Sequence, residues 1–450
     1  MELSLKKNRT ILASLFIFTL LGDVAFSFAV KSSGRRVSKT SCVVSIGGSE
    51  EAFRSLGKIL AFDMGFSGQF KTSIRRLKAK NDIKSECADL FEKGVDLHLK
   101  ITPVKTKSTS KQKARVEVIQ TWLGKRAYSK TIEFDPKNAV RSGHTISASV
   151  LKALTGKRGV CQSTLAWCQD SSIYCADYGC MEKRVLVNSP GTKFALSFHT
   201  KAPLLFFSQA TENNNELSSV DLSNFRERVR FSYPGLTMQF SPSKDGTKGV
   251  VCMSGSRGNT ELYLYDQSLC NKLGRQAFQQ LTKNGGTNAS PCFLPNGDVV
   301  FCSDFQTGRS GRPQLFYLDM KGKRVVRITD GRGYCAAPSY CEKKQKIVFN
   351  KAVDGVFQLF SLDLKGFNPS KFIEGRGLRA KRLTFDRSHK TEPQWHPDGD
   401  FVAFVRKGVG IFGSGKAQIA VLNLIDDSVR IVTRGTSPCG FPAWTNRTLY

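Results

Sequence analysis

The chain has 450 residues, of which 40% are hydrophobic and 10% aromatic, so it is long enough and apolar enough for two globular domains. Lysine and arginine number 68 against 37 acidic residues, and the resulting net charge of +31 favours anionic partners or membrane surfaces. The basic residues are scattered and form no nucleic-acid-binding module, so we expect no nucleic-acid partner.

Residues 1–29 have the pattern of a secretory signal peptide. Lys6, Lys7 and Arg9 precede an apolar run, and Ser27-Phe28-Ala29 places small residues at a cleavage site. The run has about 11 residues, whereas a membrane span needs about 20. We therefore predict an exported protein, peripheral to membranes, that begins near Val30. Cleavage removes three basic and two acidic residues and leaves a net charge of +30.

Two further segments precede the repeats described below. Residues 30–41 are polar, basic and without periodicity, which predicts a flexible N-terminal arm. Residues 42–156 are predicted to form a small α/β domain. Its expected strands are 43–46, 95–101, 116–122 and 128–134, and its expected helical segments are 50–62, 89–91 and 146–154.

Residues 160–450 repeat a four-strand pattern. An aromatic residue, usually two positions after a proline, recurs at 198, 240, 293, 340, 395 and 444. These spacings of 42, 53, 47, 55 and 49 residues are typical of a propeller blade. A tight turn such as Pro397-Asp398-Gly399 leads to a second strand. A third strand ends near an acidic residue, and a fourth ends in an apolar residue and threonine at 282, 329, 384 and 433.

The two ends of the repeat region complement each other. Phe441-Pro442-Ala443-Trp444 is a first strand with no blade after it, whereas the strands near 165–167, 173–175 and 184–187 have no first strand before them. Pairing them closes a ring without exposed edges. The predicted fold is an α/β N-terminal domain followed by an all-β six-bladed β-propeller closed by the C-terminal strand.

The order of these parts resembles the TolB family, periplasmic propeller proteins of the Tol–Pal system with WD40-like repeats. The residues that carry the resemblance are Leu56–Asp63, Ser67–Phe70, Gly94–Asp96, His144-Thr145, Leu154–Gly156 and the C-terminal Phe-Pro-Ala-Trp. The resemblance covers almost the whole chain after the signal peptide. The chain departs from the family in degraded blade turns at 200–202 and 342–344, in an insertion near 367–379 and in its many cysteines.

The resemblance implies a non-enzymatic adaptor in the periplasm, without catalytic residues, metal or cofactor. In the family, the lipoprotein Pal binds at the canal mouth of the propeller, and the inner-membrane protein TolA binds the N-terminal arm. The system supports outer-membrane integrity, membrane invagination during cell division and protein import. By position, a Pal-like partner would meet the loops that lead into the first strands, at Gly235, Asn288, Ser290, Ala336, Thr391, Glu392 and Gly440. A TolA-like partner would meet Val30, Lys31, Arg35, Arg36 and Val37.

The alternative function is a secreted propeller hydrolase or its accessory domain. A hydrolase needs a Gly-x-Ser-x-Gly elbow, and the nearest match, at 65–69, lacks its final glycine. Residues 408–413 satisfy Gly-x-Gly-x-x-Gly, but a strand pattern follows, which favours a hairpin loop. The five histidines show no zinc spacing, and surface or hydrogen-bonded roles are expected for His389 and His396 rather than a role in the canal. A sugar-binding or metal-binding propeller is a third class.

The thirteen cysteines all follow the signal peptide, where disulfides can form. Cys292 and Cys302 are expected nearly opposite each other on one hairpin, as are Cys175 and Cys180. Buried free thiols that pack as small core residues are the other interpretation.

Overall fold

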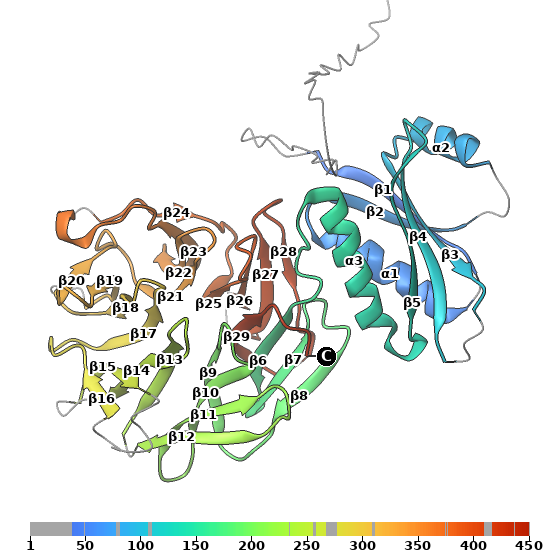
Figure 1. Ribbon diagram of the computed structural model, residues 1–450. Coiled ribbons are helices and arrows are strands. Elements are labelled where there is room, and N and C mark those ends of the chain that lie inside the picture. The colour runs from blue at the N-terminus through green and yellow to red at the C-terminus, as the bar shows by residue number, and fades with distance from the viewer. Residues whose placement is uncertain are drawn as a thin grey trace, which may run out of the picture.

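The computed structural model describes residues 38–449 except 49, 78–81, 107–109, 234, 255–257, 267–276, 308–310, 374, 376, 409–415 and 436. An α/β domain at the N-terminus is followed by a six-bladed β-propeller (Figure 1), as the sequence predicts. The predicted signal peptide and the arm residues 30–37 lie outside the described residues.

The N-terminal domain is a five-stranded sheet in the order β2-β1-β3-β4-β5 with three helices. Its strands are β1 (Thr40–Ile46), β2 (Phe70–Arg76), β3 (Leu97–Val104), β4 (Gln112–Gln120) and β5 (Lys125–Phe134). Its helices are α1 (Glu51–Phe66), α2 (Ile83–Glu92) and α3 (Ala139–Thr155), the last preceded by a 3₁₀ turn at Pro136–Asn138. Strand β1 pairs in parallel with β2 and β3, whereas β3, β4 and β5 are antiparallel.

Helices α1 and α3 cover the sheet face that looks toward the propeller (Figure 1), and their apolar residues form one core with Val44, Leu99 and Val116. Two glycines permit this close packing. A Cβ on Gly57 would meet Ile46 Cδ1 at 2.3 Å, and a Cβ on Gly143 would meet Ile59 Cγ2 at 2.7 Å. Helix α3 therefore lies directly against α1.

Helix α2 covers the other sheet face with few contacts. Its Leu90 packs on Val43, and its Glu86 forms ion pairs with Arg75 at 2.6 Å and Lys100 at 3.2 Å.

Each blade is a four-stranded antiparallel sheet whose strands follow one another in sequence, except at the ring closure. Blade I is β29 (Cys439–Thr445), β6 (Thr164–Gln169), β7 (Ser172–Asp177) and β8 (Lys183–Val187). Blade II is β9 (Thr192–Phe198), β10 (Leu204–Ala210), β11 (Asn215–Asp221) and β12 (Glu227–Tyr233). Blade III is β13 (Thr237–Pro242), β14 (Lys248–Ser254), β15 (Thr260–Asp266) and β16 (Phe278–Gln280).

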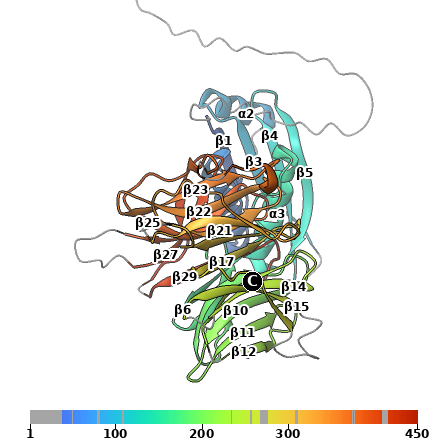
Figure 2. The same cartoon turned by 90° about the vertical axis from the view of Figure 1, so that its left-hand side faces the viewer.

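The remaining blades complete the ring. Blade IV is β17 (Asn288–Phe293), β18 (Val299–Ser303), β19 (Gln314–Asp319) and β20 (Arg324–Arg327). Blade V is β21 (Cys335–Cys341), β22 (Lys346–Val353), β23 (Val356–Asp363) and β24 (Lys381–Arg382), with a 3₁₀ turn at Pro369–Lys371. Blade VI is β25 (His389–Trp395), β26 (Phe401–Lys407), β27 (Gln418–Asn423) and β28 (Val429–Ile431). In Figure 2 the strands β10, β11 and β12 of blade II lie across the ring from β22 and β23 of blade V.

The C-terminal strand closes the ring, as predicted. Strand β29 pairs antiparallel with β6, with Trp444 opposite Leu165 and Cys439 opposite Gln169. Trp444 is buried and its ring packs edge-on against His396 of blade VI. The ring thus closes through a strand from the far end of the chain, which pairs the inner edge of β6 and completes blade I.

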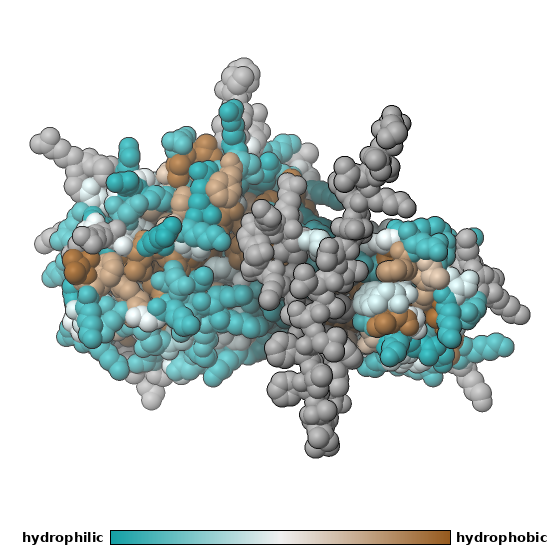
Figure 3. Space-filling view, turned by 90° about the horizontal axis from the view of Figure 1, so that it is seen from above, coloured by the Kyte–Doolittle hydropathy of each residue, from teal (hydrophilic) through white to brown (hydrophobic). Residues whose placement is uncertain are grey.

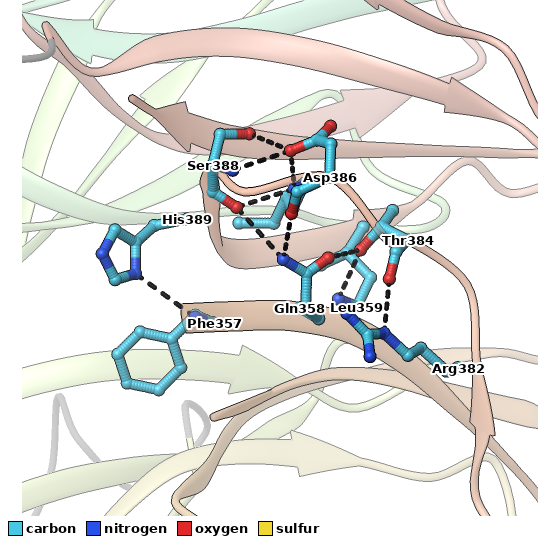
Figure 4. Close-up of polar contacts among 9 residues, drawn as sticks. Phe357, Gln358, Leu359, Arg382, Thr384, Asp386, Ser388 and His389 are labelled. Atoms are coloured by element: carbon cyan, nitrogen blue, oxygen red, sulfur yellow. Dashed lines mark hydrogen bonds and ion pairs between the residues drawn. The ribbon is translucent and has the colours of Figure 1, made fainter. Parts of the chain in front are cut away.

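In four blades a threonine ties the third strand to the end of the fourth. Thr384 Oγ1 accepts the Leu359 N–H at 2.9 Å and donates to Gln358 Oε1 at 2.8 Å (Figure 4). Gln358 then donates its Nε2 to the Asp386 carbonyl at 2.6 Å. Thr282, Thr329 and Thr433 accept the equivalent N–H groups of Leu262, Leu315 and Ile419. Because an unpaired buried N–H is costly, this contact explains the repeated apolar residue and threonine.

The propeller has two distinct faces. First and third strands run in the same direction, because neighbouring strands are antiparallel. We call the side on which they end the hairpin face, and the side where loops lead into the first strands the loop face. The N-terminal domain lies on the hairpin face: Lys39 pairs with Asp426 after β27 at 2.5 Å, and Lys157 pairs with Asp400 after β25 at 2.7 Å. The loop face is the side away from these contacts.

Three sequence predictions differ from the structure. The basic segment after α1 contains an unpredicted strand, β2, an edge strand with mostly polar residues. Strand β1 begins at Thr40, so the last two residues of the 30–41 segment belong to the sheet. Phe240 lies one residue after the bulged Gln239, where four other blades carry proline, and Pro242 takes the position of the recurring aromatic residue.

Of the two interpretations of the cysteines, the structure supports free thiols and not the pairs Cys292/Cys302 and Cys175/Cys180. All twelve described cysteines are free thiols. The bulge in β17 places Ala289 opposite Cys302 and Val300 opposite Cys292, so the two cysteines do not face each other. Cys302 instead donates its thiol to the Cys335 carbonyl of the next blade at 3.2 Å. Among the described residues the thiols therefore serve as packing residues, in the N-terminal domain as well as within and between blades.

The visible surface is mainly hydrophilic, with apolar residues in small separate patches (Figure 3). Within the described ranges, none of the helices has the length and apolar character that a membrane crossing requires.

Candidate functional site: the propeller canal

The central canal is lined by six inner strands that share one backbone irregularity. Each has a β-bulge, and at each bulge a residue other than glycine adopts the left-handed conformation. These residues, with φ between 22° and 56°, are Ala195, Gln239, Ser290, Ala337, Glu392 and Phe441. Such a conformation costs on the order of 1–3 kcal/mol per residue, so a ring of six is a feature that the rest of the fold must hold in place.

The bulge explains the proline in the repeated motif. Pro291, Pro338, Pro393 and Pro442 each follow the left-handed residue directly. A bulge leaves one residue out of the ladder, so proline loses nothing there by lacking an N–H.

The canal holds a cavity of about 230 Å³, lined by all six left-handed residues. Thr200, Lys244, Pro295 and Glu342, which follow the first strands, also line it, so the cavity extends toward the hairpin face. Lys244 Nζ lies 2.6 Å from Glu342 Oε1 and joins blade III to blade V past blade IV. This exposed ion pair narrows the canal on the hairpin face.

Glu392 is the one acidic residue among the six left-handed residues of the canal. Its Oε2 accepts the Phe441 N–H of the neighbouring blade at 2.5 Å. Burial raises the pKa of Glu392 to about 7, against the lowering effect of that hydrogen bond. The canal therefore holds a carboxyl group that changes charge near neutral pH and that a cationic group of a partner would keep ionised.

In three blades, the side chain two positions before the left-handed residue is buried and hydrogen-bonded at the loop face. Lys193 donates to the Gly191 carbonyl at 2.9 Å, and Lys390 donates to the Ser388 carbonyl at 2.7 Å; both lysines are buried. Asn288, with no exposed surface, donates to Glu261 Oε2 at 2.9 Å. These buried contacts hold the loops that surround the mouth.

Four of the seven predicted canal residues lie at or near the canal mouth, and the other three do not. Ser290 and Glu392 line the cavity, and Gly440 lies beside Glu392, since a Cβ added to it would stand 3.7 Å from Glu392 Oε2. Thr391 is half-buried next to Glu392. These four positions are close enough to the mouth to meet a partner.

The other three predicted residues are explained by packing. Asn288 is buried and hydrogen-bonded, so its side chain does not face the mouth. Ala336 packs against the core between blades IV and V. A Cβ on Gly235 would stand 2.1 Å from Ser254 Oγ, so glycine is needed there for close packing. The arm residues Val30, Lys31, Arg35, Arg36 and Val37 lie outside the described residues.

Sequence reasoning missed four of the left-handed residues and the ion pair on the hairpin face. Ala337 and Phe441 stand directly before a repeated proline, and that position could have identified them. Lys244 and Glu342 belong to degraded turns, and only the ring places them together.

His396 and His389 do not line the canal cavity and are hydrogen-bonded, as expected. His396 Nδ1 accepts the Asp398 N–H at 3.1 Å, and its Nε2 lies 2.7 Å from Ser163 Oγ. His389 Nδ1 accepts the Phe357 N–H at 3.2 Å (Figure 4). In the part of the chain that the structure covers, no cluster of three or more His, Cys, Asp or Glu residues could hold a metal ion.

The glycine-rich stretch 408–413 connects β26 to β27, and these strands pair antiparallel. The interpretation as a hairpin connection is therefore confirmed, although residues 409–415 are outside the described ranges.

Comparisons with known proteins agree with this architecture. Residues 151–377 match the family model described as the TolB beta propeller domain. A TolB homolog of Chlorobium luteolum is 25% identical over 215 residues, which are 46% of this chain and 46% of that protein. The match thus spans about half the length of this curated relative.

Among solved structures, TolB from Acinetobacter baumannii superposes with a TM-score of 0.75 at 17% identity, covering 91% of this chain and 97% of that one. At this identity the superposition shows a shared fold.

Proposed function

The chain belongs to the TolB β-propeller family, and from this premise we propose that it is a periplasmic adaptor of a Tol–Pal system. In this proposal a Pal-like lipoprotein binds at the canal mouth on the loop face, and a TolA-like inner-membrane protein binds the N-terminal arm. Its role is to support outer-membrane integrity and invagination during cell division, with a further role in protein import. The proposed order of segments is a signal peptide (1–29), an arm (30–41), an α/β domain (42–156) and a propeller (160–450).

The observation that carries the proposal is the left-handed ring in the canal. A strained backbone repeated in six blades, around a cavity that the Glu392 carboxyl group lines among the left-handed residues, is typical of a built recognition site. The side chains of Lys193, Asn288 and Lys390 hold the surrounding loops, so the loop-face mouth is rigid before a partner arrives. A preorganised mouth loses little entropy on binding.

The positions of the two proposed sites support an adaptor. Lys39, near the end of the arm, pairs with Asp426 on the hairpin face, whereas the loops around the canal mouth are on the loop face. The N-terminal domain also contacts the hairpin face and leaves the loop face uncovered. Partners at the arm and at the mouth therefore approach from opposite sides and need not compete. The sequence predicts that the arm is flexible, and a flexible segment can bind by becoming ordered on contact.

A pull-down from envelope extracts tests the proposal, with the chain from Val30 onward as bait and mass spectrometry to identify what is captured. We expect a peptidoglycan-associated lipoprotein and an inner-membrane protein. Deletion of residues 30–37 should remove the inner-membrane protein alone, and Glu392→Arg should remove the lipoprotein alone.

Glu342→Gln, on the hairpin face, is the matched control and should retain both partners. Capture that disappears completely at moderate ionic strength would indicate attraction to the net positive charge only, because exposed charges are screened within about 10 Å at 0.1 M salt. That result would reject the adaptor function.

A further inference from the structure

Four polar side chains from the two domains meet in a buried cluster. Asp63 comes from the end of α1, His144 from α3, Asp177 from the end of β7, and Tyr178 from the turn after β7. None of the four is more than 1% exposed. Burying ionisable groups costs several kcal/mol unless each is paired, so their partners decide what the cluster does.

His144 lies between two carboxylates. Its Nδ1 is 2.9 Å from Asp63 Oδ2, and its Nε2 is 3.7 Å from Asp177 Oδ2. The Tyr178 hydroxyl donates to Asp63 Oδ1. Asp177 is fixed in turn by the N–H groups of the β7–β8 turn, with Gly179 N at 2.8 Å and Met181 N at 2.7 Å. One imidazole thus joins a carboxylate of the N-terminal domain to a carboxylate of blade I.

The protonation state of His144 follows from these neighbours. Burial lowers the pKa of His144, but the hydrogen bonds and charges of Asp177 and Asp63 outweigh it and raise the pKa to about 9. The other groups that face this cluster are the Tyr178 hydroxyl and the Cys161 thiol, whose pKa is raised by burial. At neutral pH His144 is therefore a buried cation between two anions.

The cluster lies where α1 meets the seam between blades VI and I. Phe66, the last residue of α1, packs with a tilted ring against Tyr178 of blade I, at 4.5 Å between ring centroids, and stacks on Phe401 of blade VI at 5.6 Å. Asn423 Nδ2 donates to the Phe66 carbonyl at 2.9 Å, and Arg430 donates to the Gly65 carbonyl at 3.4 Å. Because the last carbonyls of a helix lack partners within the helix, the propeller completes the C-terminal end of α1.

We propose that Asp63, His144 and Asp177 form a charge latch that holds the N-terminal domain on the propeller seam, and that loss of the imidazolium charge releases the domain while both domains remain folded. The other interdomain ion pairs, Lys39–Asp426 and Lys157–Asp400, lie nearer the surface and contribute little each. The latch is independent of the partners proposed above. With this latch, the position of the arm relative to the canal depends on whether the buried His144 keeps its proton.

The sign of the pH effect follows from linkage. The folded state raises the pKa of His144 from 6.5 to about 9, so it binds this proton more tightly than the unfolded chain does. The contribution of the latch is therefore complete below pH 6.5 and is lost as the pH rises through about 9.

The first test is NMR of the full chain with ¹³C-labelled histidine, where His144 is identified as the signal lost in His144→Gln. We expect this signal to remain in its charged position through pH 8. His98 and His396 provide internal contrast, because burial lowers their pKa values to about 3 and about 4. A His144 signal that is already neutral at pH 7 would overturn the latch.

The second test is whether the domains separate. We expect His144→Gln at pH 7, and the unchanged chain at pH 10, to show a larger radius of gyration in solution scattering with unaltered circular dichroism. Calorimetry of His144→Gln should show two transitions where the unchanged chain shows one.

Lys157→Gln, which removes a surface ion pair between the domains, is the control and should match the unchanged chain. If His144→Gln retains the compact shape and the single transition, the latch is rejected. If this variant does not fold, scattering of the unchanged chain between pH 7 and pH 10 decides, and a constant radius rejects the proposal.

Discussion

Phe441 donates its backbone N–H to Glu392 Oε2 at 2.5 Å across the boundary between blades I and VI. The contact exists because Phe441 is left-handed, which turns its N–H out of the strand ladder and into the canal. This N–H is the hydrogen-bond donor that opposes the effect of burial on the Glu392 carboxyl group. The protonation of Glu392 is therefore coupled to the stability of the ring.

Glu392→Gln should make the protein more stable at pH 8 than the unchanged chain. The folded state raises the pKa of Glu392 from 4.5 to about 7, so the unchanged chain loses stability as the pH rises through this range, by roughly 3 kcal/mol at most. Glutamine keeps an acceptor for the Phe441 N–H and has no charge to bury. Urea unfolding at pH 5 and pH 8 measures the difference. A variant that is less stable at pH 8 would show that the ionised carboxylate stabilises the ring.

Trp444→Ala should destabilise the whole propeller. Trp444 is buried in the strand that closes the ring, so truncation loses apolar contacts and leaves a cavity, at a cost of about 3–5 kcal/mol. Thermal unfolding measures the change. Phe385→Ala is the matched control, because Phe385 is 72% exposed and its loss should change stability by less than about 0.5 kcal/mol. Equal effects of the two variants would argue against a sealed ring.

Thr384→Val should cost about 1–3 kcal/mol although the two side chains have similar volume. Valine would leave the Leu359 N–H and the Gln358 Oε1 without this partner inside blade V (Figure 4). The control is Thr145→Val, since Thr145 is exposed on α3 and bonds only to the Arg141 carbonyl of its own helix. Chemical denaturation of both variants gives the comparison, and a neutral Thr384→Val would contradict the role of the repeated threonine.

The repeats could be predicted from the sequence because each blade carries its own local signals. The turn at Pro397-Asp398-Gly399 and the threonines at fourth-strand ends depend on contacts inside one blade, so they leave a pattern in the chain. Strand β2 leaves no such pattern in the sequence, because an edge strand with mostly polar residues shows little alternation of apolar and polar residues. Phe240 was assigned to the wrong position because a bulge changes the register without any change in composition.

Part of the canal could be predicted from the sequence, whereas the latch could not. Glu392 and Ser290, which line the cavity, were predicted because the family resemblance places a partner at the segments that lead into the first strands, and the repeats locate those segments. Asp63, His144 and Asp177 come from segments far apart in the chain, and only the docking of two domains brings them together. No periodicity or spacing records such a contact.

Gly440→Arg should block capture of a Pal-like partner without unfolding the ring. Gly440 does not have a left-handed backbone, and a Cβ there would meet only Glu392 Oε2, at an ordinary contact distance of 3.7 Å. An arginine can therefore fit, pair with Glu392 and fill the mouth. We expect stability to change by less than about 0.5 kcal/mol, as for a surface substitution, while the partner is lost from pull-downs.

The comparison with Glu342→Gln decides which mouth of the canal is used. Glu342 pairs with Lys244 on the hairpin face, so its substitution opens that end and leaves the loop face unchanged. If binding is lost in Gly440→Arg and kept in Glu342→Gln, the partner enters from the loop face, opposite the N-terminal domain. If Glu342→Gln alone alters binding, the partner enters beside the N-terminal domain, and the arm and the canal would then compete for the same space.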